Sequence, residues 1–265
     1  MRKELLEKTR KELALRKKSE HTQKMYLHFI ERFLENCNKE VSLLNSEDAR
    51  NFISSLTNNL DASSVAIARC ALKFFYKEIL QKDLETIEIP KKEKKTPNIL
   101  TREEILKLIR NAPSLREKLL IKFMYYCGLK VSECSNLKIE NINLETKRIT
   151  LLGSKARIVN LHTNLVEDLK EFIANKKEGY LFEGNKNNPL STRAIQKIVS
   201  KLAKQVLNKD VNCNMLRHSF AVHMLEKGVD VYTLKDMLSY ASLQSAKQYE
   251  DLLKKKAKLE NPFKF

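Results

Sequence analysis

Apolar residues recur at helical spacing through the first third of the chain. Between Ser19 and Cys37 they fall every three or four positions, which places them on one face of a helix. Ser46 can cap a second helix that ends near Leu56, and Asp61 can cap a third that ends near Leu80. This pattern predicts a small, all-helical domain. The inward positions of the three helices are Tyr26, Phe29, Ile30, Phe33, Leu34, Ala49, Phe52, Ile53, Leu56, Val65, Ala68, Leu72, Phe75 and Ile79.

A charged segment with a proline near each end interrupts the helical pattern. It has no apolar periodicity, which is typical of a linker between domains. We therefore expect a basic linker over 89–98 that separates a first domain, 1–88, from a second domain, 99–250, with a tail over 251–265. The lysines of this linker are Lys91, Lys92, Lys94 and Lys95.

Beyond the linker, helical and strand-like patterns are mixed. The stretch Thr101–Glu104 has a capping-box pattern, and the apolar run 115–127 predicts a central helix. Alternating residues over 148–152 and 157–161 flank a glycine-containing turn and predict a hairpin, and Tyr180–Phe182 is a candidate third strand. The fold class is therefore mainly α, of the α+β type, with a helical N-terminal domain and a mixed domain that holds a small antiparallel sheet. Further helices are expected over 191–207, 214–227, 230–238 and 243–253.

The charge of the chain indicates a polyanionic partner. The 50 Lys and Arg residues outnumber the 33 Asp and Glu residues, which gives a net charge of +17. Nucleic acid is the default partner of so basic a protein, although a lysine-rich surface from an AT-rich or thermophilic genome would explain part of the excess. Membrane insertion is not expected, because no apolar run approaches the ~20 residues that span a bilayer. The N-terminus lacks the apolar core of a secretory signal, so we expect a cytoplasmic protein.

The cysteines do not indicate a disulfide framework or a zinc site. There are five, an odd number, and no two form a C-x-x-C pair. Cys213, His218 and His223 lie five residues apart on one predicted helix and therefore face different ways. We expect no bound metal.

Two predicted helices carry cations at regular spacing. On the helix over 191–207 they lie opposite the apolar face, at steps of four, four and three residues. The helix that begins at Asp61 carries a shorter stripe with steps of four. Both stripes are candidate contacts for DNA phosphates, and for the shorter one a solvated helix face is an equal alternative. The two stripes are Arg193, Lys197, Lys201 and Lys204, and Arg69, Lys73 and Lys77.

The segment with the clearest chemistry runs from Asn214 to His223, with Tyr249 following 32 residues after Arg217. An arginine can hold a phosphate through two parallel hydrogen bonds. A tyrosine can attack a phosphate and form a covalent bond to it. Together they are candidates for phosphoryl transfer.

Three stretches in this order resemble the tyrosine recombinase (phage integrase) family, and its Xer-type branch in particular. Tyr125–Cys134 is similar to the family's G-L-R-x-S-E-L, and the helix Met215–Glu226 is similar to its second arginine motif. Leu238–Tyr240 is similar to the family's L-G-H, and Tyr249 follows Tyr240 at the family's distance. The resemblance covers nearly the whole chain.

The resemblance implies cleavage and rejoining of double-stranded DNA through a covalent 3′-phosphotyrosine, without a metal, ATP or another cofactor. It implies that the first domain is a DNA-binding domain of the core-binding type, and that the two domains clamp the duplex. The protein would then be associated with the nucleoid. In the family, the segment after the nucleophile docks onto a neighbouring protomer. We therefore expect a homo-oligomer on DNA, held through the C-terminal tail with Leu259 and Phe263 as anchors. A frayed tail is the alternative.

By the same resemblance, Tyr249 is the nucleophile and Arg217 the second arginine of the catalytic set. Lys130 replaces the first arginine and keeps its charge but not its planar fork. Asn214 replaces a histidine and cannot carry a proton, whereas Tyr240 replaces another histidine and can still donate a hydrogen bond. The lysine of the hairpin is Lys155 if the turn is short.

These replacements leave other interpretations open. If the hairpin aligns without a shortened turn, its lysine position falls at Leu152 and the proton donor is lost. Arg217 could be a buried partner of Glu133, and Tyr249 could be a packed core residue. His218 and His223 are expected to be structural. The second functional hypothesis is therefore a non-enzymatic DNA-binding protein with the same fold. The candidate catalytic residues of the first hypothesis are Tyr249, Arg217, Lys130, Lys155, Asn214 and Tyr240.

Overall fold

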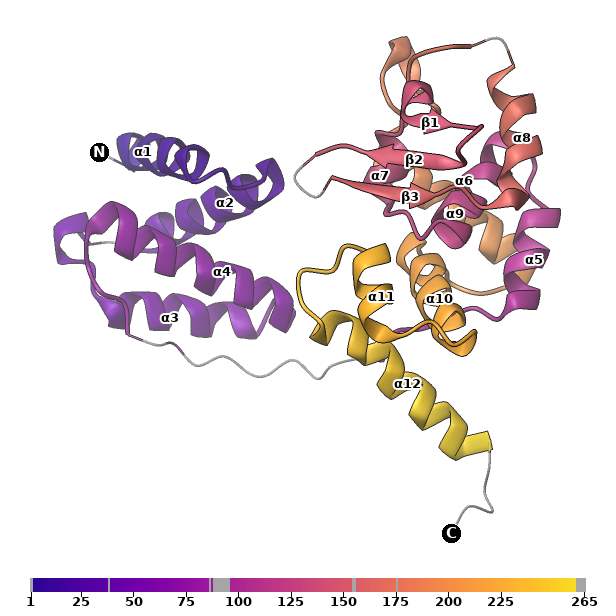
Figure 1. Ribbon diagram of the computed structural model, residues 1–265. Coiled ribbons are helices and arrows are strands. Elements are labelled where there is room, and N and C mark those ends of the chain that lie inside the picture. The colour runs from indigo at the N-terminus through magenta and orange to yellow at the C-terminus, as the bar shows by residue number, and fades with distance from the viewer. Residues whose placement is uncertain are drawn as a thin grey trace. The chain divides into compact units, whose positions relative to one another are not determined.

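The computed structural model describes residues 2–37, 39–85, 87, 96–153, 156–174 and 176–260, with side chains to residue 255. The chain divides into two compact units, Met1–Lys94 and Lys95–Phe265, and each is described by itself. Figure 1 shows the elements of both units.

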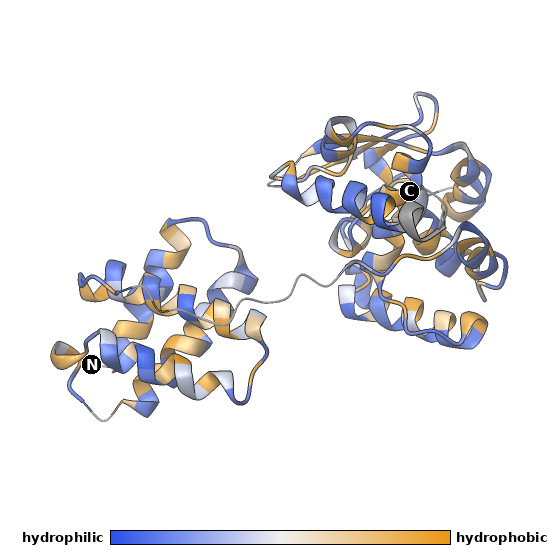
Figure 2. Cartoon of the chain, turned by 90° about the horizontal axis from the view of Figure 1, so that it is seen from below, coloured by the Kyte–Doolittle hydropathy of each residue, from blue (hydrophilic) through white to orange (hydrophobic). Residues whose placement is uncertain are grey.

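The first unit is all-helical, as predicted. Hydrophobic residues gather on the inner sides of its helices (Figure 2), and Phe33 lies at the centre of the core, with ring centroids 5.5 Å from Phe52 and 5.9 Å from Tyr76. The last helix changes from α to π geometry at Phe75, which periodicity did not reveal. The elements are α1 (Arg2–Leu15), α2 (Glu20–Asn36), the 3₁₀ turn η1 (Val41–Leu43), α3 (Ser46–Thr57), α4 (Ala62–Phe74) and the π-helix η2 (Phe75–Leu80).

The helix caps of this unit explain where its helices begin. Asp61 caps α4 as expected, and Ser19 caps α2, because their side-chain oxygens accept backbone N–H groups of the first turn. The cap of α3 is Asn45 and not Ser46. With Asn45 as the cap, Asp48 occupies the third helical position and accepts the Asn45 N–H at 3.0 Å, which completes a capping box.

The second unit combines helices with a three-stranded antiparallel sheet. The hairpin of β2 and β3 is confirmed, with Ile149 opposite Val159. The third strand was wrongly placed at 180–182. It is β1, which pairs directly with β2, whereas Tyr180 forms only one isolated bridge to Lys138. The elements are α5 (Arg102–Arg110), α6 (Leu115–Tyr126), α7 (Val131–Ser135), η3 (Ile139–Asn141), β1 (Ile142–Asn143), β2 (Arg148–Leu151), β3 (Arg157–Asn160), α8 (Thr163–Ile173), η4 (Asn185–Asn187), α9 (Thr192–Leu207), α10 (Cys213–Glu226), α11 (Val231–Met237) and α12 (Gln244–Glu260).

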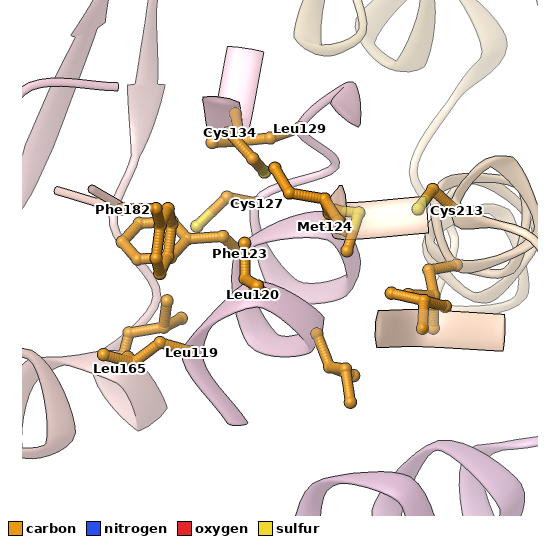
Figure 3. Close-up of a cluster of buried hydrophobic side chains, with 14 of the residues drawn as sticks. Leu119, Leu120, Phe123, Met124, Cys127, Leu129, Cys134, Leu165, Phe182 and Cys213 are labelled. Atoms are coloured by element: carbon orange, nitrogen blue, oxygen red, sulfur yellow. The ribbon is translucent and has the colours of Figure 1, made fainter. Parts of the chain in front are cut away.

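Helix α6 is the centre of the larger core of this unit, in agreement with its strongly apolar sequence. Every residue from Leu119 to Met124 is buried. The Phe123 and Phe182 rings pack edge to face, with their centroids 5.9 Å apart (Figure 3). The one lysine inside this run, Lys122, donates to Asp168 at 2.5 Å, which compensates the cost of burying its charge.

Helices α10, α11 and α12 form a separate, smaller core, and they lie together in Figure 1. Phe220, Leu234, Leu238 and Tyr249 are among its buried side chains. This core matters for function because two of the three motif stretches belong to it. The third, the turn after α6, packs against it through Gly128.

A substitution at Gly128 can test how closely the turn after α6 packs against the smaller core. Its φ is +61°, and a Cβ there would lie 2.8 Å from side-chain atoms of Leu238 and Phe220. We expect Gly128→Ala to lower the free energy of unfolding by about 2–4 kcal/mol, because a left-handed alanine is strained and the added methyl group overpacks the core. Urea denaturation of both proteins measures the difference.

Gly228→Ala is the matched control. Gly228 also has a positive φ, +88°, but a Cβ there meets no atom within 4 Å. It should lose only the backbone contribution, about 1–2 kcal/mol. Equal losses for the two variants would contradict the close packing at Gly128.

Candidate active site

Arg217 lies on α10 with only 4% of its surface exposed. Its Nη2 donates to the Leu238 carbonyl at 2.5 Å, and its Nη1 donates to the Gly128 carbonyl. The guanidinium also lies 5.4 Å from the centre of the Tyr240 ring, in cation–π range. One buried cation therefore joins the turn after α6, the turn after α11 and helix α10, which are the three stretches that carried the sequence motifs.

Tyr249 lies on α12 and is fully buried, at 0% exposure. Its hydroxyl is 2.7 Å from His218 Nδ1 and 2.8 Å from the Tyr240 hydroxyl. Burial raises the pKa of Tyr249 well above its usual value, and the Tyr240 hydrogen bond raises it further, while Arg217 acts in the opposite direction. In this conformation the Tyr249 phenol is therefore protonated at neutral pH and shielded from solvent.

His218 is the functional candidate that the sequence analysis missed. It was assigned a structural role, but its ring touches the hydroxyl of the proposed nucleophile. Burial and the adjacent Arg217 lower the pKa of His218, so the ring is neutral at pH 7. The available signal was helical geometry, since His218 is one position from Arg217 and four from Asn214.

Glu133, in α7, is the acidic partner of the cations near the turn after α6. Arg157 donates to both carboxylate oxygens, at 2.5 and 3.0 Å, and the Lys130 backbone N–H donates at 2.8 Å. Arg217 Nη1 is farther from this carboxylate, at 3.8 Å, so Arg157 and not Arg217 is its close ion-pair partner. Burial alone raises the pKa of Glu133, but the hydrogen bonds from Arg157 and Lys130 outweigh it and the net pKa is lowered.

Lys130 lies at the edge of this group. Its ammonium is 3.4 Å from Glu133, and about a third of its side chain is exposed. Burial, with the nearby charges of Arg217 and Arg157, lowers the pKa of Lys130 against the opposing effect of Glu133. A partly exposed cation next to a buried one can meet a phosphate without a large desolvation cost.

Two further candidate positions, Asn214 and Leu152, are not joined to this network within the described part of the chain. Asn214 is exposed on the first turn of α10, and its side chain makes no hydrogen bond to the described part of the chain. Leu152 follows β2 and is 71% exposed. Lys155 lies outside the described residues.

The four cations of the α9 stripe, Arg193, Lys197, Lys201 and Lys204, are all exposed. Among them, within the described ranges, only Lys204 approaches a carboxylate, Asp210 at 3.7 Å.

The stripe of the first unit is less uniform. Lys73 and Lys77 are exposed, whereas Arg69 is half-buried and donates to the Ile87 carbonyl at 3.2 Å. Two of its three cations are therefore available to a phosphate. The linker lysines Lys91, Lys92, Lys94 and Lys95 lie outside the described residues.

The described residues provide neither a membrane-spanning helix nor a metal site. None of the helices in these ranges is long and apolar enough to cross a membrane. No group of His, Cys, Asp and Glu side chains in the same ranges could hold a metal ion.

Comparisons with known proteins agree in both units. Residues 98–256 match the phage integrase family, and residues 5–86 match the N-terminal SAM-like domain of phage integrases. The tyrosine recombinase XerA of Pyrococcus furiosus is 34% identical over 261 residues, covering 94% of this chain and 90% of that protein. XerA of Pyrococcus horikoshii is 32% identical over 256 residues, covering 93% and 88%.

A solved structure shows the same fold at lower identity. The XerH site-specific recombinase, bound to palindromic difH substrate in a post-cleavage complex, has a TM-score of 0.71 and 22% identity to this chain. The match covers 92% of this chain and 79% of that one. The mainly α fold with a small sheet is thereby confirmed.

The carboxylate of Glu133 should be essential for stability, because it neutralises Arg157, whose side chain is only 7% exposed. We expect Glu133→Gln to lower the free energy of unfolding by about 3–5 kcal/mol at pH 7, since it leaves a buried cation without its partner. The pKa of Glu133 is lowered in the folded state, so its contribution is complete above the unfolded value of about 4.3 and is lost as pH falls through the folded value. The difference in unfolding free energy between the natural chain and Glu133→Gln should therefore become smaller at acidic pH. Urea denaturation of both proteins at neutral and acidic pH measures it.

Glu167→Gln provides the comparison. Glu167 pairs with Lys170 at 3.2 Å, but its side chain is 83% exposed. Its replacement should change stability by less than about 0.5 kcal/mol at any pH. A Glu133→Gln variant as stable as this control would show that the buried pair is dispensable.

Proposed function

Because the chain belongs to the phage integrase family of tyrosine recombinases, we propose that it cuts and rejoins DNA at specific sites through a 3′-phosphotyrosine on Tyr249. The contacts of that residue support the proposal most directly. Its hydroxyl is hydrogen-bonded to His218 and Tyr240, and the Arg217 guanidinium lies against the Tyr240 ring. A phenol, a base and a cation that can neutralise a phosphate are thus gathered in one place.

Each side chain has a distinct role in the proposed reaction. Arg217 and Lys130 neutralise the charge that develops on the phosphoryl oxygens. Lys155 protonates the leaving 5′ oxygen, since an alkoxide is a poor leaving group. Asn214 and Tyr240 donate hydrogen bonds where the family has histidines. These residues need no metal or cofactor for the step.

The conformation described here is a resting one, on this proposal. Tyr249 has no exposed surface, and Arg217 is occupied by two backbone carbonyls. A phosphate can reach both only if the turn after α11, which supplies the Leu238 carbonyl and Tyr240, moves away while α12 keeps its contact with α10 at His218. Binding to DNA would supply the free energy for this opening, because the phosphate replaces the carbonyls as the partner of the guanidinium.

One set of observations favours a second function, a non-enzymatic DNA-binding protein. The nucleophile is fully buried, and Lys130, Asn214 and Tyr240 differ from the family pattern. Removing a single transition-state donor typically lowers a rate by about 10²–10³-fold. Under this alternative the chain keeps its contacts with duplex DNA but forms no covalent bond.

Both functions require double-stranded DNA as the partner. We propose that residues 1–88 are the core-binding domain, that 89–98 form a basic linker, and that 99–250 are the catalytic domain, the two domains clamping the duplex. The phosphates would be contacted by the α9 stripe, by the linker lysines and by the stripe of the first unit. The XerH structure, which contains a difH substrate, supports this partner by analogy.

The tail is proposed to hold protomers together on DNA. Helix α12 continues past Tyr249 to Glu260, and Leu252 and Leu253 pack beside the smaller core. Residues 251–265 would then extend to a neighbouring protomer, with Leu259 and Phe263 as anchors; the side chains of both lie outside the described part. A DNA-bound homo-oligomer of this kind would belong to the nucleoid in the cytoplasm.

Covalent chemistry can be tested with a nicked suicide substrate, whose cleavage cannot be reversed. Its sequence would come from mapping the genomic DNA that the protein binds. We expect a denaturant-stable protein–DNA adduct with the natural chain and none with Tyr249→Phe, because a phenylalanine has no nucleophilic oxygen. Tyr232→Phe, a change at an exposed tyrosine on α11, should form the adduct normally. DNA binding without any adduct would instead establish the non-enzymatic function.

The α9 stripe can be tested through the salt dependence of DNA binding. Replacing Lys197 and Lys201 by glutamine should weaken binding and reduce the slope of log K against log salt by about 2, since each lost phosphate contact contributes about 0.9. The control is the double replacement of Lys170 and Lys176, which pair with Glu167 and Glu183. It removes the same charge and should leave the slope nearly unchanged. Identical slopes for the two variants would show that net charge, not the stripe, governs binding.

A further inference from the structure

The hydrogen bonds of the Tyr249 hydroxyl allow two arrangements of hydrogens. A phenol has one hydrogen, so Tyr249 donates to one of its two neighbours and accepts from the other. If Tyr249 donates to His218 Nδ1, then Tyr240 donates to the Tyr249 oxygen. In this arrangement the phenolic proton of Tyr249 points at a ring nitrogen that can accept it.

We propose that His218 is the general base that accepts the phenolic proton of Tyr249 during strand cleavage. The inference rests on the proposed cleavage activity and identifies the group that starts it. His218 Nδ1 is 2.7 Å from the hydroxyl, within the reach that direct proton transfer requires. Since that hydroxyl is the attacking atom, His218 contacts the reacting group itself.

The Tyr249 O–H bond breaks as its oxygen forms a bond to phosphorus, and the proton moves to His218 Nδ1. The P–O5′ bond breaks, and the 5′ oxygen takes a proton from a lysine ammonium or from water. When the strand is rejoined, the 5′ hydroxyl attacks phosphorus and returns its proton to the lysine or to water. The bond between Tyr249 and phosphorus breaks, and the proton of His218 returns to the phenolate oxygen.

Within the described part of the chain, no other side chain near this hydroxyl is as suitable a base. Tyr240 is a phenol, whose neutral oxygen is a very weak base. Arg217 is a permanent cation, and its Nη atoms already donate to backbone carbonyls. Asn214 cannot carry a proton. The neutral imidazole is therefore the group whose basicity fits a proton transfer near pH 7.

The groups that set the titration of His218 are few in the described part of the chain. Arg217 precedes it on α10, Tyr249 faces it from α12, and Tyr240 reaches it only through Tyr249. Burial and the charge of Arg217 both lower the pKa of His218. A base must be unprotonated to act, so the cleavage rate should fall at pH values below that pKa and stay level above it.

The test is single-turnover cleavage of the nicked suicide substrate as a function of pH. For the natural chain, we expect the cleavage rate to fall with decreasing pH, and we call this fall the acidic limb. Its midpoint should lie below about pH 6.5, the ordinary pKa of histidine. His218→Gln keeps a hydrogen-bonding side chain but cannot bind the proton, so its rate should fall about 10²–10⁴-fold and the limb should disappear. Thermal unfolding and DNA affinity of the variant should match those of the natural chain.

Two further variants separate catalysis from structure. His162→Asn is the control, because His162 is also a half-buried histidine with a lowered pKa, but it caps α8 and stacks on Tyr126. It should keep both the rate and the limb. His218→Ala leaves space for a free base, so added imidazole should restore part of its cleavage rate.

The outcomes distinguish this inference from the proposed function. An adduct formed by His218→Gln within threefold of the natural rate, with its acidic limb intact, would overturn the role of His218 and leave cleavage by Tyr249 standing. Failure of imidazole to rescue His218→Ala would count against it as well. If the natural chain itself formed no adduct, cleavage and the role of His218 would both be refuted.

Discussion

The structure of the second unit depends on one buried guanidinium. Arg217 binds the carbonyls at the ends of two turns, at Gly128 and Leu238, and lies against the ring of Tyr240. A buried arginine without these partners would be strongly destabilising. Because the partners come from α10, from the turn after α6 and from the turn after α11, satisfying one cation fixes the relative positions of all three segments.

The same contacts create a conflict between stability and chemistry. The carbonyls that satisfy Arg217 occupy the donors that a phosphate would use, and the Tyr249 hydroxyl is buried against His218 and Tyr240. Burial keeps the phenol neutral, since an ionised oxygen in this position would lack solvation. Under the proposed function, this site would react only when a polyanion competes for the guanidinium.

Buried and exposed cations of the second unit have different partners. In the interior, Glu133 holds Arg157 at hydrogen-bond distance, and Asp168 holds Lys122. On the surface, the cations of α9 face solvent with few acidic neighbours. The cations of α9 are consequently accessible to a polyanion, while the buried charges are neutralised locally.

The sequence by itself determined the helical first domain, the hairpin and the order of the motifs, because apolar periodicity and capping residues act over a few positions. It also identified Arg217, Tyr240 and Tyr249 as members of one site through their resemblance to a family. It did not reveal the π turn at Phe75 or the pairing of β1, which arise from packing. Only the tertiary structure decided which groups touch the Tyr249 hydroxyl, since His218 and Tyr249 are 31 positions apart and meet because α10 and α12 pack together. Likewise, only the fold could show that Arg157 takes the carboxylate of Glu133 and leaves Arg217 to the carbonyls, because a choice between two cations depends on distances in space.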